Sequence, residues 1–159
     1  MKKITTSIAI LLLLAGTFFS CNNEKEEFFD EPIDVPFTVF SLTETFCRWV
    51  WRGGHSPYRE VIIINSDEEL QNFLICREES DFPFIDFSKY TLLLARGVEN
   101  GISVTKPVIY TDLQQYSLRN YVMNVLLRIG GTANMSEWNF AIITDKLDSN
   151  ARIRLNVTN

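Results

Sequence analysis

Beyond residue 36, the apolar positions follow the patterns of β-strands more often than those of helices. Residues 37–51 are rich in Phe, Val, Thr and Trp, which favour strands. Residues 60–64 form a short β-branched run typical of a buried strand, and residues 90–96 are apolar on both faces, as in a central strand. Apolar and polar positions alternate along residues 153–158, which predicts a strand with one face in solvent.

Three further stretches complete the predicted strands. Residues 102–110 form the first of these strands. Because Pro107 cannot donate a ladder hydrogen bond, we expect the second half of this strand to lie at a sheet edge or a bulge. Residues 118–129 form a long strand with one apolar face; a helix is the rival, but the β-branched and aromatic residues favour a strand. Residues 138–144 form a strand that is apolar on both faces.

One helix is predicted to begin at Ser66. The sequence Ser66-Asp67-Glu68-Glu69 is typical of a capping box, in which Ser66 caps the backbone amides and Glu69 reaches back. Its acids lie at the favourable end of the helix dipole. Apolar residues at 70, 73 and 74 supply a buried face, and we expect the helix to end near Cys76 or Arg77.

These elements predict a single domain over residues 37–159, which is long enough to bury a core. One helix among about six to eight strands indicates a β-rich α+β fold. Because short turns join most of the strands, we expect a mostly antiparallel sheet, or a sandwich-like sheet, with one main α-helix.

The first part of the chain, residues 1–20, is interpreted as a signal peptide. Two lysines precede an apolar run at residues 8–16, and small Ser20 lies just before Cys21. A transmembrane helix is the alternative, but a span needs about 20 apolar residues. The residues before Cys21 resemble a lipobox, with Phe18 at the usual leucine position. The resemblance implies a thioether-linked diacylglycerol on Cys21, usually with an added N-acyl chain such as palmitate.

Residues 21–36 are acidic, contain two prolines and are predicted to form a tether. Lys25, Glu26 and Glu27 resemble the export signal of Bacteroidetes-type surface lipoproteins, in which a lysine and two acids closely follow the lipidated cysteine. The alternative is a solvated acidic tether without a signalling role. With Cys21 lipidated, these features predict an outer-membrane protein that faces the cell exterior.

Charge and cysteine content narrow the function classes. The chain has a formal net charge of −5 and no basic patch or basic helix, so we expect no nucleic-acid partner. Besides Cys21 there are Cys47 and Cys76, and an exported protein can bridge them. Two buried free thiols are the alternative.

No residue pattern specifies a catalytic centre. His55 is the only histidine and has no partners at metal-ligand spacing, so we expect no metal and no cofactor. Asp81, Asp86 and the acids at 78–79 can be drawn as a glycosidase-like carboxylate pair, although a solvated loop is the simpler interpretation. The chain has no G-x-S-x-G motif, which disfavours a serine hydrolase.

The loop over residues 52–58 is the predicted contact surface, through Arg52, His55 and Tyr58. Tryptophan also suits binding surfaces, but we expect at least two of Trp49, Trp51 and Trp138 to lie in the core.

The span from Ile64 to Val157 resembles the C-terminal domain of PrcB-type protease-complex subunits and related lipoproteins of unknown function. The resemblance rests on the helix start at 66–70, the run Asp86–Tyr90 before an apolar strand, the turn from Gly97 to Ile102, and the late strand at 138–146. It implies a β-rich accessory or binding role and supplies no catalytic residue.

The sequence therefore predicts a surface-anchored lipoprotein that acts as a non-catalytic binding or accessory module. Two alternatives stay open: an assembly subunit of an envelope protease complex, and a small hydrolase with an unrecognised carboxylate site. The expected partners are the membrane, through the lipid on Cys21, and a protein or polysaccharide of unknown identity.

Lipidation is directly testable. The wild-type chain should enter the detergent-rich phase in detergent phase partitioning, and Cys21→Ala should move it to the aqueous phase because the acyl chains provide the anchorage. A Cys21→Ala protein that stayed in the detergent phase would contradict the lipid anchor.

Overall fold

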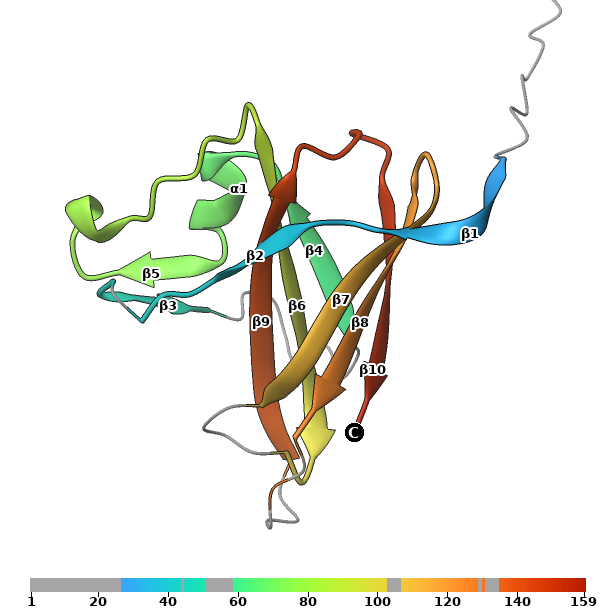
Figure 1. The fold of residues 1–159 in the computed structure, drawn as a ribbon. Coiled ribbons are helices and arrows are strands. Elements are labelled where there is room, and N and C mark those ends of the chain that lie inside the picture. The colour runs from blue at the N-terminus through green and yellow to red at the C-terminus, as the bar shows by residue number, and fades with distance from the viewer. Residues whose placement is uncertain (1–26, 44, 51–58, 103–106, 129, 131–134) are drawn as a thin grey trace, which may run out of the picture.

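The computed structural model describes residues 27–43, 45–50, 59–102, 107–128, 130 and 135–159. Strands make up most of the regular structure of the described part (Figure 1). The strands are β1 (Phe28–Asp34), β2 (Phe37–Phe40), β3 (Cys47–Trp49), β4 (Glu60–Ile64), β5 (Leu74–Cys76), β6 (Tyr90–Asn100), β7 (Val108–Ser117), β8 (Asn120–Leu127), β9 (Met135–Asp145) and β10 (Arg152–Thr158). The helical elements are α1 (Asp67–Gln71) and a 3₁₀ turn, η1 (Glu79–Asp81).

The strands form two four-stranded sheets and a two-stranded one. Sheet A has the order β1-β7-β8-β10, sheet B has the order β2-β9-β6-β4, and β3 pairs with β5. All neighbouring strands are antiparallel except β8 and β10, which are parallel. The β-rich, largely antiparallel architecture expected from the sequence is confirmed.

Sheets A and B pack face to face and enclose the first core. Its buried residues come from both sheets and from the segments that follow β6 and β9: Leu93, Ala95, Ile102, Leu113, Tyr121, Met123, Val125, Leu127, Trp138, Ile142, Leu147 and Val157. The one-sided apolar pattern of β8 supplies four of these side chains, so the strand interpretation of residues 118–129 is confirmed over residues 120–127.

The opposite face of sheet B carries a second core. A covering layer packs on this face, formed by α1, β3, β5 and the segment 77–89 (Figure 1). The buried members of the second core are Ile64, Leu70, Leu74, Ile85, Leu92, Leu94 and Ala141. Sheet B is therefore the middle of three layers.

Strand β6 shows why a run apolar on both faces is required here. Leu93 and Ala95 point into the first core, whereas Leu92 and Leu94 point into the second. Side chains of a strand alternate between its two faces, so a strand in the middle layer needs apolar residues on both faces where it meets the two cores. In β9, Ile142 and Ala141 divide between the two cores in the same way.

The helix is shorter than the sequence predicted. Ser66 caps it as expected, because the Glu69 amide donates to the Ser66 hydroxyl over 3.1 Å. However, α1 ends at Gln71, and residues 74–76, which were assigned to the helix, form β5. The cause is non-local: β5 pairs with β3, and a disulfide joins Cys47 to Cys76 directly across the pair. The disulfide is one of the two alternatives that the sequence left open.

Part of the segment that the sequence predicts to be a tether is a strand. Residues 28–34, which were assigned to it, form β1 and pair with the edge of β7 through an irregular register. Most side chains of β1 are exposed, so backbone pairing holds this segment where its acidic composition predicted a free chain. The strand expected over residues 102–110 instead begins at Val108 in the described part. No helix among the described residues is long and apolar enough to cross a bilayer.

Trp138 is the largest buried side chain of the first core, and it packs on Gly97. The two residues are direct neighbours in the β6–β9 register. A Cβ atom at position 97 would lie 2.9 Å from the Trp138 Nε1 and 3.0 Å from its Cε2. Glycine at this position therefore leaves the space that the indole ring occupies.

Gly97→Ala should lower the free energy of unfolding by about 1–3 kcal/mol, because the added methyl group overpacks the core at the indole. Chemical denaturation of the intact chain measures the change. The same substitution in a Trp138→Phe background should cost less, because the smaller ring vacates the contact. Equal costs in the two backgrounds would show that the Gly97–Trp138 contact is not the cause.

Candidate binding groove

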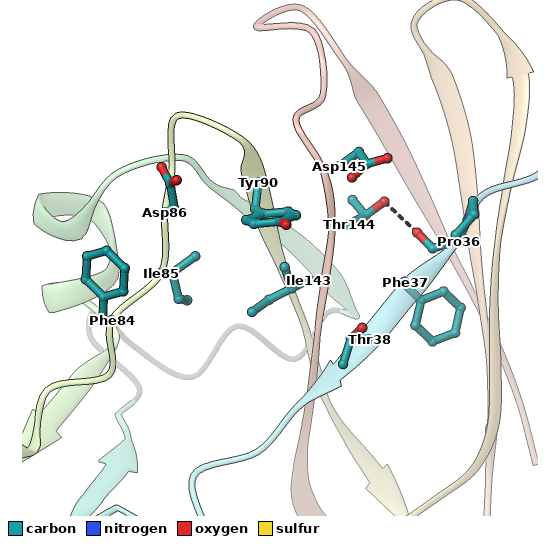
Figure 2. Close-up of a pocket in the computed structure, with 10 residues that line it drawn as sticks. All are labelled: Pro36, Phe37, Thr38, Phe84, Ile85, Asp86, Tyr90, Ile143, Thr144 and Asp145. Carbon is teal, nitrogen blue, oxygen red and sulfur yellow. Dashed lines mark hydrogen bonds between the residues drawn. The ribbon is translucent and has the colours of Figure 1, made fainter.

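A groove of about 510 Å³ opens on the covered side of sheet B, beyond the end of the covering layer (Figure 2). We call it the groove. Its lining residues come from β2, the covering layer, β6 and β9: Pro36, Phe37, Thr38, Phe84, Ile85, Asp86, Tyr90, Ile143, Thr144 and Asp145.

The register of sheet B forms the floor of the groove. Thr38 of β2 lies opposite Ile143 of β9, and Tyr90 of β6 lies opposite Asp145 of β9. Because alternate residues of a strand share a face, these four side chains extend the surface of the second core. The covering layer stops short of them, and Tyr90 is 40% exposed.

Phe84 forms the outer wall of the groove and is 90% exposed. Its neighbour Ile85 is only 5% exposed and belongs to the second core, so the backbone beneath Phe84 is anchored. Figure 2 shows the segment with Phe84 and Ile85 on one side of Ile143 and Thr38 on the other. The Phe84 ring is thus exposed to solvent, whereas the backbone that carries it is held by the packing of Ile85 in the second core.

Hydrogen bonds fasten the segment behind Phe84 to the sheet. The Tyr90 amide donates to the Asp86 carbonyl over 3.0 Å, which closes a turn. The Lys146 amide donates to the Lys89 carbonyl over 2.7 Å, and the Lys146 Nζ donates to the Phe87 carbonyl over 2.8 Å. These bonds connect the covering layer to the end of β9, so the groove is preformed.

Two carboxylates lie at the groove, and they differ in their partners. Asp86 accepts hydrogen bonds from Ser88 and forms an ion pair with Lys89 at 2.9 Å. The Ser88 hydrogen bond, followed by that of Lys89, holds the pKa of Asp86 below its ordinary value, so it is ionised at neutral pH. The Asp145 side chain is exposed and has no hydrogen-bond or ion-pair partner among the described residues. Asp145 therefore offers a negative charge that no described group neutralises.

The carboxylates considered earlier for catalysis have local structural roles. Asp81 accepts from the Glu78 amide over 3.1 Å at the start of η1, and Asp86 closes the turn before β6. Each carboxylate therefore bonds to its own turn, and no hydrogen bond links the two. Among the residues that the structure describes, no three His, Cys, Asp or Glu side chains gather at metal-binding distances.

Of the predicted site residues, the described structure brings together Cys47 and Cys76, in the disulfide. The lipidation site Cys21, the signal residues Lys25 and Glu26, and the loop residues of the predicted contact surface all lie outside the described residues. Those loop residues are Arg52, His55 and Tyr58. Glu27 is exposed just before β1.

The two tryptophans that the structure describes pack against the cores. Trp138 is 1% exposed in the first core. Trp49 is partly buried against the second core, where its ring meets Phe40 edge-on at 5.9 Å. The expected core position is therefore confirmed for Trp138, Trp49 is only partly buried, and Trp51 lies outside the described residues.

Sequence reasoning missed the groove. The one available signal was the triplet Phe82-Pro83-Phe84, which places two large apolar residues inside a polar stretch. The meeting of Tyr90 with Asp145 depends on the β6–β9 register, which no local pattern reveals.

No family model, curated protein or solved structure matches this chain. The resemblance to PrcB-type subunits therefore stays a prediction.

Proposed function

We propose that the protein is a surface-anchored lipoprotein whose β domain binds a partner in the groove without converting it. The observation that carries the proposal is Phe84, which is 90% exposed on a support whose next residue is buried. Exposing a Phe side chain forgoes about 1.5–3 kcal/mol of burial. Because the ring is exposed while its neighbour Ile85 is buried, a partner that covers the ring would gain that free energy.

The chemistry of the groove favours a polypeptide partner. Ile143, Ile85 and Phe84 present apolar surface, which suits an apolar side chain. Tyr90 and the unneutralised Asp145 lie at one end and suit a Lys or Arg side chain, which a carboxylate and an aromatic face both attract. The proposed ligand is therefore a segment that carries an apolar residue close to a basic residue.

The anchor places this groove near a membrane surface. In the proposed mature protein, the lipid on Cys21 is joined to the start of β1 at Phe28 by seven residue steps. A fully extended chain spans at most 3.3–3.6 Å per residue, so this link reaches about 25 Å. A partner held on the same membrane would meet the groove at high effective concentration.

The two alternatives from the sequence fare differently in the structure. An assembly role in an envelope complex uses the same groove, with a fellow subunit as the polypeptide partner. A hydrolase needs a carboxylate free to move protons. The sequence's candidates Asp81 and Asp86 are engaged in the local turns described above, whereas Asp145 in the groove has no partner among the described residues. Cleavage of a bound peptide is therefore followed as a separate outcome in the test below.

A displayed peptide library screened on the intact chain tests the proposal. The enriched peptides should combine an apolar residue with Lys or Arg. Phe84→Ala should weaken their binding by about 30-fold or more, as expected for an apolar hot spot. Asp145→Asn should weaken binding a few-fold and reduce its salt dependence, because an exposed ion pair contributes about 0.2–1 kcal/mol.

Leu118→Ala is the matched control, since Leu118 is 74% exposed between β7 and β8, away from the groove. It should leave peptide affinity unchanged. If the peptides bind the Phe84→Ala variant as well as the wild type, the groove is not their binding site. If the bound peptides are cleaved, the protein is an enzyme and not a binding module. If neutral oligosaccharides bind and Phe84→Ala weakens their binding, the partner of the groove is a glycan and not a polypeptide.

A further inference from the structure

The outer face of sheet A is a second surface, on the side of the sandwich remote from the groove. The outward side chains of β10 are all exposed, at residues 152, 154, 156 and 158. A pocket of about 340 Å³ opens on this face next to β1. We call it the basic pocket. Its lining includes Phe28, Tyr116, Asn120, Val122, Arg152 and Arg154.

Strand pairing brings two arginines to one side of the basic pocket. In the parallel β8–β10 register, Arg152 lies beside Asn120 and Arg154 beside Val122. Residues two apart on a strand point to the same face at a spacing of about 7 Å. Both guanidinium groups can therefore reach one ligand.

Arg152 and Arg154 belong to the described arginines that form no ion pair, as do Arg48, Arg77 and Arg128; what distinguishes them is that they line one pocket together. Arg59, Arg96 and Arg119 form ion pairs with Glu99, Glu60 and Asp148 respectively. Neither Arg152 nor Arg154 has a side-chain hydrogen bond or an ion pair among the described residues. No carboxylate lines the basic pocket, whereas Asp86 and Asp145 line the groove. On a chain with a net charge of −5, Arg152 and Arg154 are the only charged side chains among the described residues that line this pocket.

Aromatic and amide groups complete the pocket. Phe28, which is 63% exposed, comes from β1, and Tyr116 comes from β7. Asn120 also lines the pocket; its side-chain nitrogen donates to the Ser117 hydroxyl over 2.9 Å, and its side-chain oxygen accepts no hydrogen bond from the described residues. The pocket thus combines two cations, two aromatic rings and a hydrogen-bond acceptor.

From this combination we propose that the basic pocket binds an acidic sugar, a pyranose ring that carries a carboxylate. The guanidinium groups of Arg152 and Arg154 pair with the carboxylate, since their planar donors match its two oxygens. The C–H face of the pyranose ring packs on Phe28 and Tyr116, which a bare phosphate or sulfate would not use. A sugar hydroxyl donates to the Asn120 side-chain oxygen.

The inference stands independently of the groove, because it rests on another sheet and other residues. The test is isothermal titration of the intact chain, in a non-ionic detergent, with oligogalacturonate. The methyl-esterified oligomer serves as the neutral analogue. Oligogalacturonate should bind and the ester should not.

Arg152→Ala and Arg154→Ala should each weaken binding by roughly tenfold or more, since each removes a charge-assisted hydrogen bond. The double Lys variant should bind at an intermediate level, because charge is kept and the fork geometry is lost. Phe28→Ala should weaken binding without changing its salt dependence. Arg128→Ala is the matched control, an exposed arginine beyond the end of β8, and should have no effect.

Three results would overturn the proposal. If the esterified oligomer binds as tightly as oligogalacturonate, the protein does not recognise the carboxylate. If the Arg152→Ala, Arg154→Ala double variant still binds oligogalacturonate, the basic pocket is not the binding site. Phosphatidylglycerol vesicles that bind through these arginines while oligogalacturonate does not would assign the basic pocket to a membrane surface.

Discussion

The burial of sheet B on both faces is the constraint on which the rest of this structure depends. Strands β6 and β9 lie in the middle of that sheet and place leucine, isoleucine and alanine alternately in the two cores. Each fully buried Leu or Ile contributes about 1.5–3 kcal/mol relative to an exposed one, so a sheet used on both sides contributes more per residue than one with a solvated face. Sheet A covers one face of sheet B, and the covering layer buries the other face.

The covering layer is small, which explains both the disulfide and the groove. Its helix has a single short turn, and β3 and β5 are three residues each. Such short elements are marginal alone, and a cross-link between Cys47 and Cys76 stabilises them by restricting the unfolded chain. Because the layer is too small to cover all of sheet B, Ile143 and Tyr90 stay accessible at its edge. The candidate site is thus a direct consequence of incomplete coverage.

Local residue patterns in the sequence were sufficient to predict the central strands and the start of the helix. The apolar runs of β6 and β9 predicted central strands, and Ser66 predicted the start of the helix. The end of α1 was missed because Leu74 and Cys76 fit a helix face as well as a strand, and their pairing with β3 is non-local. Strand β1 was missed because backbone pairing holds it, while its side chains are those of a solvated tether.

The candidate site was less predictable than the fold. Asp145 meets Tyr90, and Arg154 lies beside Val122, only through the registers of strands far apart in sequence. Phe84 alone had a local signal, an aromatic residue in a polar stretch. Sites built from cross-strand neighbours leave no spacing motif, so their chemistry becomes visible only once the register is known.

Amide hydrogen exchange on the intact chain tests the central claim, that sheet B is the doubly buried middle layer. If sheet B is the middle layer, exchange should be slowest at residues 92–95 of β6 and 141–143 of β9, because opening them requires unfolding of both cores. Exchange should be fast along β1, which is held at one edge only. Exchange at residues 92–95 as fast as at residues 28–34 would contradict the three-layer arrangement.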